Sequence, residues 1–186
     1  MLLDSLKYIH TGLPVYIVGK GPSLHFLNKS MIGEGIIITI NDAIHKIEEM
    51  DLPNITYSMQ KDGLKGKLIP HDCSLHGIMP KRATRLVHKH ESLYCRPFYR
   101  PRIVFDNLEL GLRWFDFSAL SAIKIAGVMG CNKYYFVSFD ACTNHDGGMY
   151  MAGVKYVRSD GYFRQCQKMK PFLQHINYQW ITPSKP

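Results

Sequence analysis

The sequence has no apolar run of the roughly 18 residues that a membrane-spanning helix needs. Its first stretch, residues 1–14, contains Asp4 and no long apolar core, so we expect no secretory signal peptide there. Internal repeats and low-complexity linkers are also missing. A chain of 186 residues can bury a substantial core without cross-links, so the expectation is a single domain over residues 1–186.

Cysteines are few and scattered, at positions 73, 95, 131, 142 and 166, with no C-x-x-C pair. An odd number at wide spacing argues against a zinc ribbon and against a disulfide framework. It fits a reducing compartment, so we expect a cytoplasmic protein, with attachment to the periphery of a membrane as an alternative. The histidines of the middle segment show no metal-ligand spacing, and no metal is expected.

Acidic residues are in the minority. The chain has 15 Asp and Glu against 23 Lys and Arg, a net charge of +8. Such a balance indicates an anionic partner, such as a nucleotide, a nucleic acid or an anionic membrane surface, although a basic surface alone is the plainer interpretation.

Many of the cations lie between residues 80 and 102, interleaved with Tyr and Phe. This pattern can hold single-stranded nucleic acid, an acceptor, anionic lipid or a second copy in a homo-oligomer. A separate alternative is that Arg96, Arg100 and Arg102 bind the phosphate of a small-molecule donor. The surrounding segment, about 61–107, shows no clean periodicity and is expected to be an irregular basic insertion.

Short β-branched runs alternate with helical patterns along the rest of the chain. Runs such as PVYIVGK, IIITIND and KYYFVSFDA indicate strands buried on both faces, and segments such as AIHKIEEM and SALSAIKIAGVMG indicate helices. A further helix is expected at PSLHFLNKS. The pattern predicts an α/β fold, a Rossmann-like parallel sheet of five or six strands between helices.

The first strand breaks into Gly19, Lys20 and Gly21, followed by Pro22 and Ser23. Glycines there would let the backbone approach a ligand, and a helix start would aim N–H groups at a phosphate. The turn matches neither G-x-G-x-x-G nor the Walker sequence, and a tight strand-to-helix turn needs glycine for steric reasons alone.

Polar residues follow three further strands. They are Asn41 and Asp42, then Ser58, Gln60 and Asp62, and finally Asp140. Each one alone could cap a loop or a helix. Because the carboxyl ends of parallel strands meet at one edge of a sheet, the set together predicts a binding site there.

The segments VGKGPSL, INDAI and SALSAIKIAGVMGCNKYYFVSFDA resemble the bacterial sialyltransferases of glycosyltransferase family 42 and related motility-accessory and phage proteins. The resemblance runs from about residue 15 to the last strand, with the middle poorly matched. It implies that Gly19, Lys20 and Gly21 cradle the nucleotide of a nucleotide-activated sugar, with Ser23 beside them.

The same resemblance implies further ligand residues along the chain. Asn41 would face the phosphate or donor sugar, with Ser58 or Gln60 beside it. The resemblance also implies that Ser118 matches the serine of the family's Ser-Gly and that Asp140 lies where the family holds the nucleoside. Tyr150 would stand for a loop tyrosine that steadies the leaving phosphate.

Several positions depart from the family. Lys20 stands where the family has Asn, Ala119 replaces the Gly of Ser-Gly, and Cys142 falls on the first loop tyrosine. The segment that carries the family's catalytic histidine is much shorter here. His145, in a Gly-containing loop, is the candidate general base, with a solvent-exposed loop histidine as the plainer interpretation.

The sequence therefore predicts a metal-independent glycosyltransferase that uses a nucleotide-activated sugar, with a CMP-sugar as the donor that the resemblance implies. No cofactor is expected besides this donor. Two alternatives stay open: a non-catalytic nucleotide- or nucleic-acid-binding protein on the same core, and a phosphotransferase.

Overall fold

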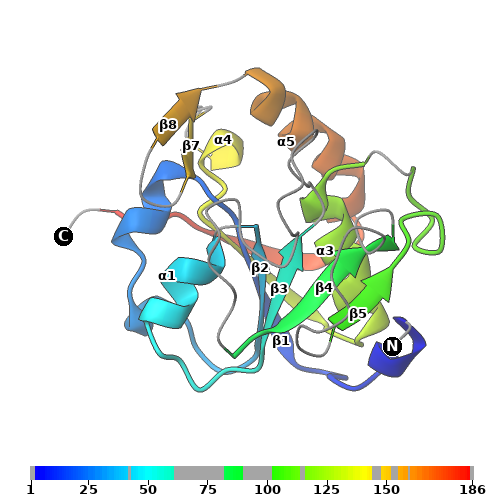
Figure 1. The fold of residues 1–186 in the computed structure, drawn as a ribbon. Coiled ribbons are helices and arrows are strands. Elements are labelled where there is room, and N and C mark those ends of the chain that lie inside the picture. Colours follow the sequence, from blue (N-terminus) through cyan, green and yellow to red (C-terminus); the bar gives the residue numbers. More distant parts are fainter. Residues whose placement is uncertain are drawn as a thin grey trace, which may run out of the picture.

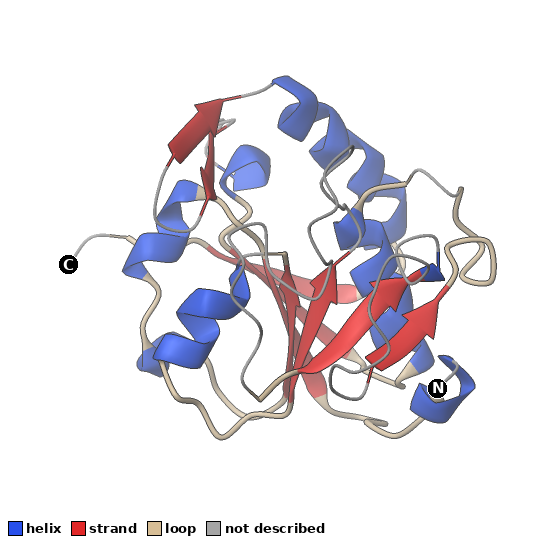
Figure 2. Cartoon of the chain, in the orientation of Figure 1, coloured by secondary structure: helices blue, strands red, loops and turns tan. Residues whose placement is uncertain are grey.

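A computed structural model describes residues 3–41, 43–60, 82–89, 102–113, 116–143, 148–151, 155–158 and 160–184. Within these ranges a seven-stranded, all-parallel sheet lies between helices (Figures 1 and 2). Its strands are β1 (Pro14–Val18), β2 (Ile36–Ile40), β3 (Thr56–Gln60), β4 (Thr84–His88), β5 (Arg102–Phe105), β6 (Lys133–Val137) and β9 (Asn177–Ile181). The prediction of a Rossmann-like α/β fold is confirmed.

The strand order, β5-β4-β3-β2-β1-β6-β9, reverses its direction of growth at β1. The chain adds β2 to β5 on one side of β1, and β6 then pairs with its other side, Tyr16 opposite Tyr135. In parallel α/β sheets ligands bind outside the carboxyl ends of the strands at such a reversal. The topology thus points to the loops that follow β1 and β6.

Helices cover both faces of the sheet, with α3 and α5 on one side and α1 on the other (Figure 1). The helices are η1 (Leu3–Leu6), η2 (Pro22–Phe26), η3 (Lys29–Met31), α1 (Ala43–Glu49), α3 (Ser118–Val128), α4 (Asp140–Thr143) and α5 (Asp160–Leu173). A separate antiparallel pair, β7 (Gly148–Met151) and β8 (Lys155–Arg158), lies with β7 beside η2.

The Ile-rich run of β2 is explained by burial on both faces. Ile38 packs into the core under α3, and Ile37 packs into the core under α1. All five residues of β2 are buried, which removes the polar alternation of a half-exposed strand. On α3, the small residues Ala122 and Ala126 are fully buried and let the helix lie close to the sheet.

Two sequence-based expectations were wrong in detail. The segment PSLHFLNKS forms two short 3-10 helices, η2 and η3, because Leu27 and Asn28 between them are extended. The supposedly irregular stretch 61–107 supplies β4 and β5, which raises the strand count of the described sheet to seven. The sequence did not indicate β4 as a buried strand, because two of its buried residues, Arg85 and His88, are polar.

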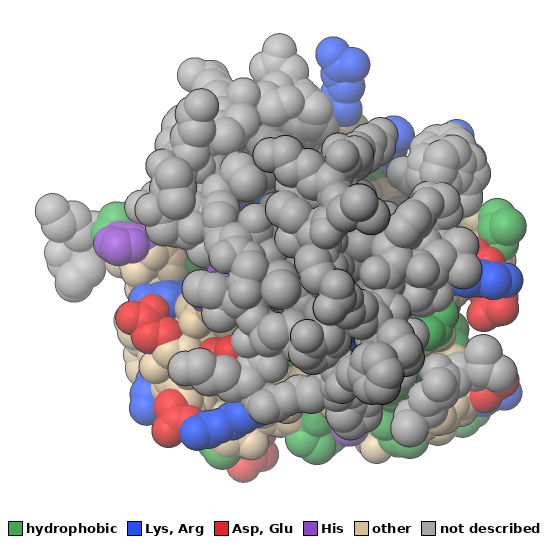
Figure 3. Space-filling view, viewed as in Figure 1, with side chains coloured by type: hydrophobic (Ala, Val, Ile, Leu, Met, Phe, Trp, Pro, Cys, Tyr) green, Lys and Arg blue, Asp and Glu red, His purple; other side chains and the backbone are tan. Residues whose placement is uncertain are grey.

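Charges of both signs lie together at the margins of the face shown in Figure 3 among the described side chains. Among the described residues, Arg82 pairs with Asp51, and the Lys89 ammonium lies 3.6 Å from the Asp106 carboxylate. Exposed pairs of this kind contribute little to stability. No helix within the described ranges has the length and apolarity needed to cross a bilayer.

Candidate functional site

A crevice of about 410 Å³ lies at the carboxyl edge of the sheet where the strand order reverses. It is lined by the turn after β1, the end of β2, the start of α3, the segment after β6 and one face of α5. Its volume falls in the range of small-ligand pockets, about 300–1,000 Å³. Of the residues predicted for the site, the crevice brings together Gly19, Lys20, Gly21, Asn41, Ser118 and Asp140.

The two glycines of the first turn allow it to lie against the segment after β6. A Cβ at position 21 would be 1.8 Å from the Asp140 carboxylate and 2.6 Å from the Ser138 carbonyl, and a Cβ at position 19 would be 2.9 Å from that carbonyl. The Gly19 N–H donates to Val137 O and the Gly21 N–H to Ser138 O, both at 2.8 Å. The glycines are thus required by contact within the protein, which is the steric alternative that the sequence left open.

Asp140 fastens this turn. Its Oδ2 accepts hydrogen bonds from the Ser23 N–H at 3.1 Å and from the Ser23 hydroxyl at 2.9 Å. The Leu24 N–H donates to Gly21 O at 3.0 Å. The expectation that η2 offers these N–H groups to a phosphate is therefore wrong for Ser23 and Leu24, because both already have acceptors.

Lys20 lies between the two glycines, lines the crevice and is only 8% exposed. A lysine that is held this close to a crevice supplies positive charge in a region of reduced water contact, where its attraction for an anion is strong. The candidate site thus contains a cation.

Two side-chain-bearing residues of the crevice have left-handed backbone conformations. Asn41, directly after β2, has φ 50°, and Ser138, directly after β6, has φ 58°. Asn tolerates this region better than Ser does, and such conformations cost about 1–3 kcal/mol and cluster at functional sites. The Ser138 hydroxyl is buried and has no hydrogen-bond partner among the described residues.

The start of α3 forms another wall of the crevice. The first N–H groups of a helix have no acceptor within it. Phe117, the N-cap residue, provides no side-chain hydrogen bond to them in the described structure, and the amides of Ser118 and Ala119 lie in the first turn. Partial positive charge at a helix start favours an anion. Within the crevice, the start of α3 therefore offers free N–H groups to an anion, whereas the Ser23 and Leu24 N–H groups of η2 already have acceptors.

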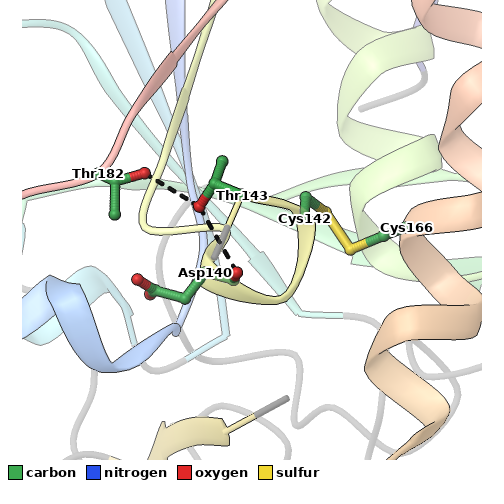
Figure 4. Close-up of a disulfide and its surroundings, with 5 residues drawn as sticks. All are labelled: Asp140, Cys142, Thr143, Cys166 and Thr182. Carbon is green, nitrogen blue, oxygen red and sulfur yellow. Dashed lines mark hydrogen bonds between the residues drawn. A yellow bond between two sulfur atoms is a disulfide. The ribbon is translucent and has the colours of Figure 1, made fainter. Parts of the chain in front are cut away.

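The helix α4 carries both Asp140 and Cys142, as Figure 4 shows. Asp140, its first residue, points toward the turn after β1, whereas Cys142 points toward α5 and forms a disulfide with Cys166. The Thr143 hydroxyl lies 3.1 Å from that of Thr182. The sequence-based argument against a disulfide framework did not anticipate this bond, because a separation of 24 positions gave no sign that α4 and α5 are neighbours.

The remaining predicted residues are placed differently. Ser58 is fully buried in β3, outside the crevice lining, with its register neighbours Thr39 and Arg85 also buried. Met59 packs in the core under α3, so its strand neighbour Ser58 faces the other side of the sheet. Ser58 is thus not part of the crevice.

Four predicted site residues carry no side-chain description. Asp42 and His145 lie outside the described residues. Tyr150 belongs to β7, opposite Tyr156 in β8, and Gln60 ends β3; only their backbones are described. Their predicted roles stay predictions.

Sequence reasoning missed the contribution of α5 and of Ser138. Gln165, Cys166 and Met169 line the crevice from α5. Their spacing along the helix places them on one face, which could have been read from the sequence only with the position of the helix in hand.

A larger hollow of about 720 Å³ lies between η1, the second half of α3 and the end of α5. Its lining mixes Asp4 and Glu109 with Lys7 and Lys124, and it contains none of the strand-end residues. Size alone does not identify a site, and the smaller crevice has the topology, the cation and the helix start that favour an anionic ligand.

The described side chains include no group of three or more His, Cys, Asp or Glu residues arranged to hold a metal ion. Lys20, the α3 amides, Asn41 and the Ser118 hydroxyl instead provide hydrogen-bond donors. This donor-rich arrangement suits a phosphorylated ligand. No protein-family model matches the chain, and no curated protein matches it in sequence at a significant level.

Proposed function

We propose that the crevice binds a nucleotide-activated sugar and that the protein is a metal-independent glycosyltransferase. The observation that carries the proposal is the meeting of Lys20, Asn41 and Ser118 in one crevice at the reversal of strand order. These three residues lie more than 20 positions apart in the chain, so their meeting is a product of the fold. The proposal also draws on the sequence resemblance, which assigns donor binding to the same positions.

In the proposed complex the donor phosphate lies at the start of α3, near the Ser118 and Ala119 amides. Lys20 neutralises its charge from the turn after β1. Both groups would be fixed before the reaction begins, and preorganised donors of this kind stabilise charge that develops on a leaving group.

The proposed transfer is a direct displacement. The acceptor hydroxyl attacks the anomeric carbon, a glycosidic bond forms, and the bond from that carbon to the phosphate oxygen breaks. The hydroxyl proton passes to a general base, for which His145 is the sequence-based candidate, and the nucleotide leaves with its negative charge near Lys20.

Binding is tested by thermal-shift measurements with CMP, UDP, GDP and their sugars in the presence of a chelator. We expect at least one nucleotide to stabilise the protein. Lys20→Gln should lower the affinity for that nucleotide about tenfold or more, because a hydrogen bond to a charged group contributes about 1.5–3 kcal/mol. Lys29→Gln is the matched control, since Lys29 is exposed in η3 and outside the crevice lining. Stabilisation by no nucleotide would contradict the proposal.

Transfer is tested by following nucleotide release from the bound nucleotide sugar. His145→Ala should lower kcat at unchanged nucleotide affinity if His145 is the base. Tight binding without any release of nucleotide would favour the non-catalytic alternative.

A further inference from the structure

A half-buried disulfide forms part of the crevice wall. Cys142 in α4 and Cys166 in α5 both line the crevice. Neither residue is fully buried and both line the crevice, so the crevice offers a small reductant a route to the bond. Disulfides that are accessible are the ones open to exchange with thiols.

The disulfide is attached to α5 at Cys166, which belongs to the less buried half of this helix. The described side chains at residues 163–168 are half-buried or exposed, whereas Met169 and Leu173 are buried in the core under α3. Packing of Met169 and Leu173 fixes the second half of α5 without the bond. Gln165, which lines the crevice, lies in the half that the disulfide secures.

The other end of the bond is anchored in the crevice itself. Cys142 lies two residues after Asp140, whose carboxylate holds Ser23 and with it the turn that carries Lys20. When the bond is closed, α4 therefore links α5 to the Lys20 turn (Figure 4). When the bond is open, the Asp140–Ser23 contact stays but the covalent link to α5 is lost.

We propose that Cys142 and Cys166 are a reversible redox clamp that sets the affinity of the crevice for its nucleotide; this rests on the proposed function. A dithiol reductant supplies two electrons and two protons, the S–S bond breaks, two thiols form, and the reductant becomes a cyclic disulfide. Opening the clamp releases the half of α5 that carries Gln165 and Cys166, so the nucleotide must order this half again on binding. The reduced protein binds the nucleotide about fivefold more weakly or worse, the low end of usual coupling between two sites.

The coupling is reciprocal, which gives a second readout. Nucleotide binding must favour the closed disulfide by the same factor by which the closed disulfide favours the nucleotide. A fivefold effect corresponds to a fall of about 20 mV in the reduction potential when nucleotide is present at saturation. A disulfide with a purely structural role would show no such shift.

The first experiment measures nucleotide affinity of the oxidised protein and of the protein reduced with dithiothreitol. Cys142→Ser should bind like the reduced protein and should not respond to dithiothreitol. Cys131→Ser is the matched control, because Cys131 is a buried free thiol elsewhere in the chain, and it should keep the difference between the two states. Equal affinity of the oxidised and reduced protein overturns the proposal, as does detection of free Cys142 and Cys166 thiols by mass spectrometry after oxidative purification.

The second experiment uses no ligand. Hydrogen exchange at residues 163–168 should become at least severalfold faster on reduction, with exchange in β1 and β6 unchanged. If no nucleotide binds either state, the proposed function fails and the affinity effect with it. Faster exchange would then still support a clamp on α5, whereas equal exchange would overturn that as well.

Discussion

Replacing Gly21 with alanine should destabilise the protein severely. The new Cβ would lie 1.8 Å from Asp140 Oδ2 and 2.7 Å from its Cγ, so the carboxylate must move. The carbonyl of Ser138, at 2.6 Å, is backbone and blocks the other direction. Movement of Asp140 breaks both of its hydrogen bonds with Ser23.

The size of the effect follows from these two bonds. Hydrogen bonds to charged groups contribute about 1.5–3 kcal/mol each, so Gly21→Ala should cost about 3 kcal/mol or more in free energy of unfolding. For a chain of this length that corresponds to a fall in Tm of about 6–12 °C. The assay is urea unfolding followed by circular dichroism, with the slope of the transition checked for two-state behaviour.

Gly127→Ala is the matched control, with an expected effect of opposite sign. Gly127 is exposed in α3, and its Cβ would meet the Tyr134 hydroxyl at 3.6 Å, an ordinary contact. Alanine is better than glycine within a helix by up to about 1 kcal/mol. A Gly21→Ala protein as stable as the wild type would refute the close contact between the first turn and the end of β6, and with it the geometry of the crevice.

Three other predictions concern buried polar groups. Burial raises the pKa of the Cys131 thiol to about 11 from 9.0, so at high pH the folded state retains a proton that the unfolded state loses. The free energy of unfolding should therefore fall by about 2–3 kcal/mol between pH 9 and 11. Comparing the urea midpoints of the wild type and Cys131→Ala over this range isolates the contribution of Cys131. Burial lowers the pKa of His10, whose Nε2 lies 2.7 Å from the Tyr57 hydroxyl. The unfolded state therefore takes up the proton first as the pH falls, and the free energy of unfolding should decline below pH 6.5. A His10→Gln protein that loses as much stability in acid as the wild type would contradict this. Ser58→Ala should leave nucleotide affinity unchanged, because Ser58 lies outside the crevice lining. Its stability should equal or exceed that of the wild type, because the buried Ser58 hydroxyl has no hydrogen-bond partner among the described residues. Weaker nucleotide binding by this variant would show that Ser58 belongs to the binding site.

The sequence was sufficient for the fold class because its strands are short runs buried on both faces. The β2 run, five consecutive buried residues, and the Ala-rich α3 have patterns that allow few alternatives. The strand β4 was not recognisable, because Arg85 and His88 are buried polar residues within it and only tertiary contacts make such burial tolerable.

The candidate site was predictable where residues directly follow strands and not where they depend on packing between distant elements. Lys20 and Asn41 follow β1 and β2, so parallel pairing alone brings them to one edge. The disulfide between Cys142 and Cys166 requires the position of α5, which no local pattern fixes. Ser58 was misplaced because alternation along a strand decides the face, and the face that meets α3 was not known.

The measurement that tests the central claim most directly is calorimetric titration of CMP, UDP and GDP into the oxidised wild type, Lys20→Gln and Ser58→Ala. We predict that at least one nucleotide binds the wild type and Ser58→Ala equally and binds Lys20→Gln at least about tenfold more weakly. Absence of binding to the wild type, or equal binding by all three proteins, would contradict a nucleotide site in the crevice between β1 and β6.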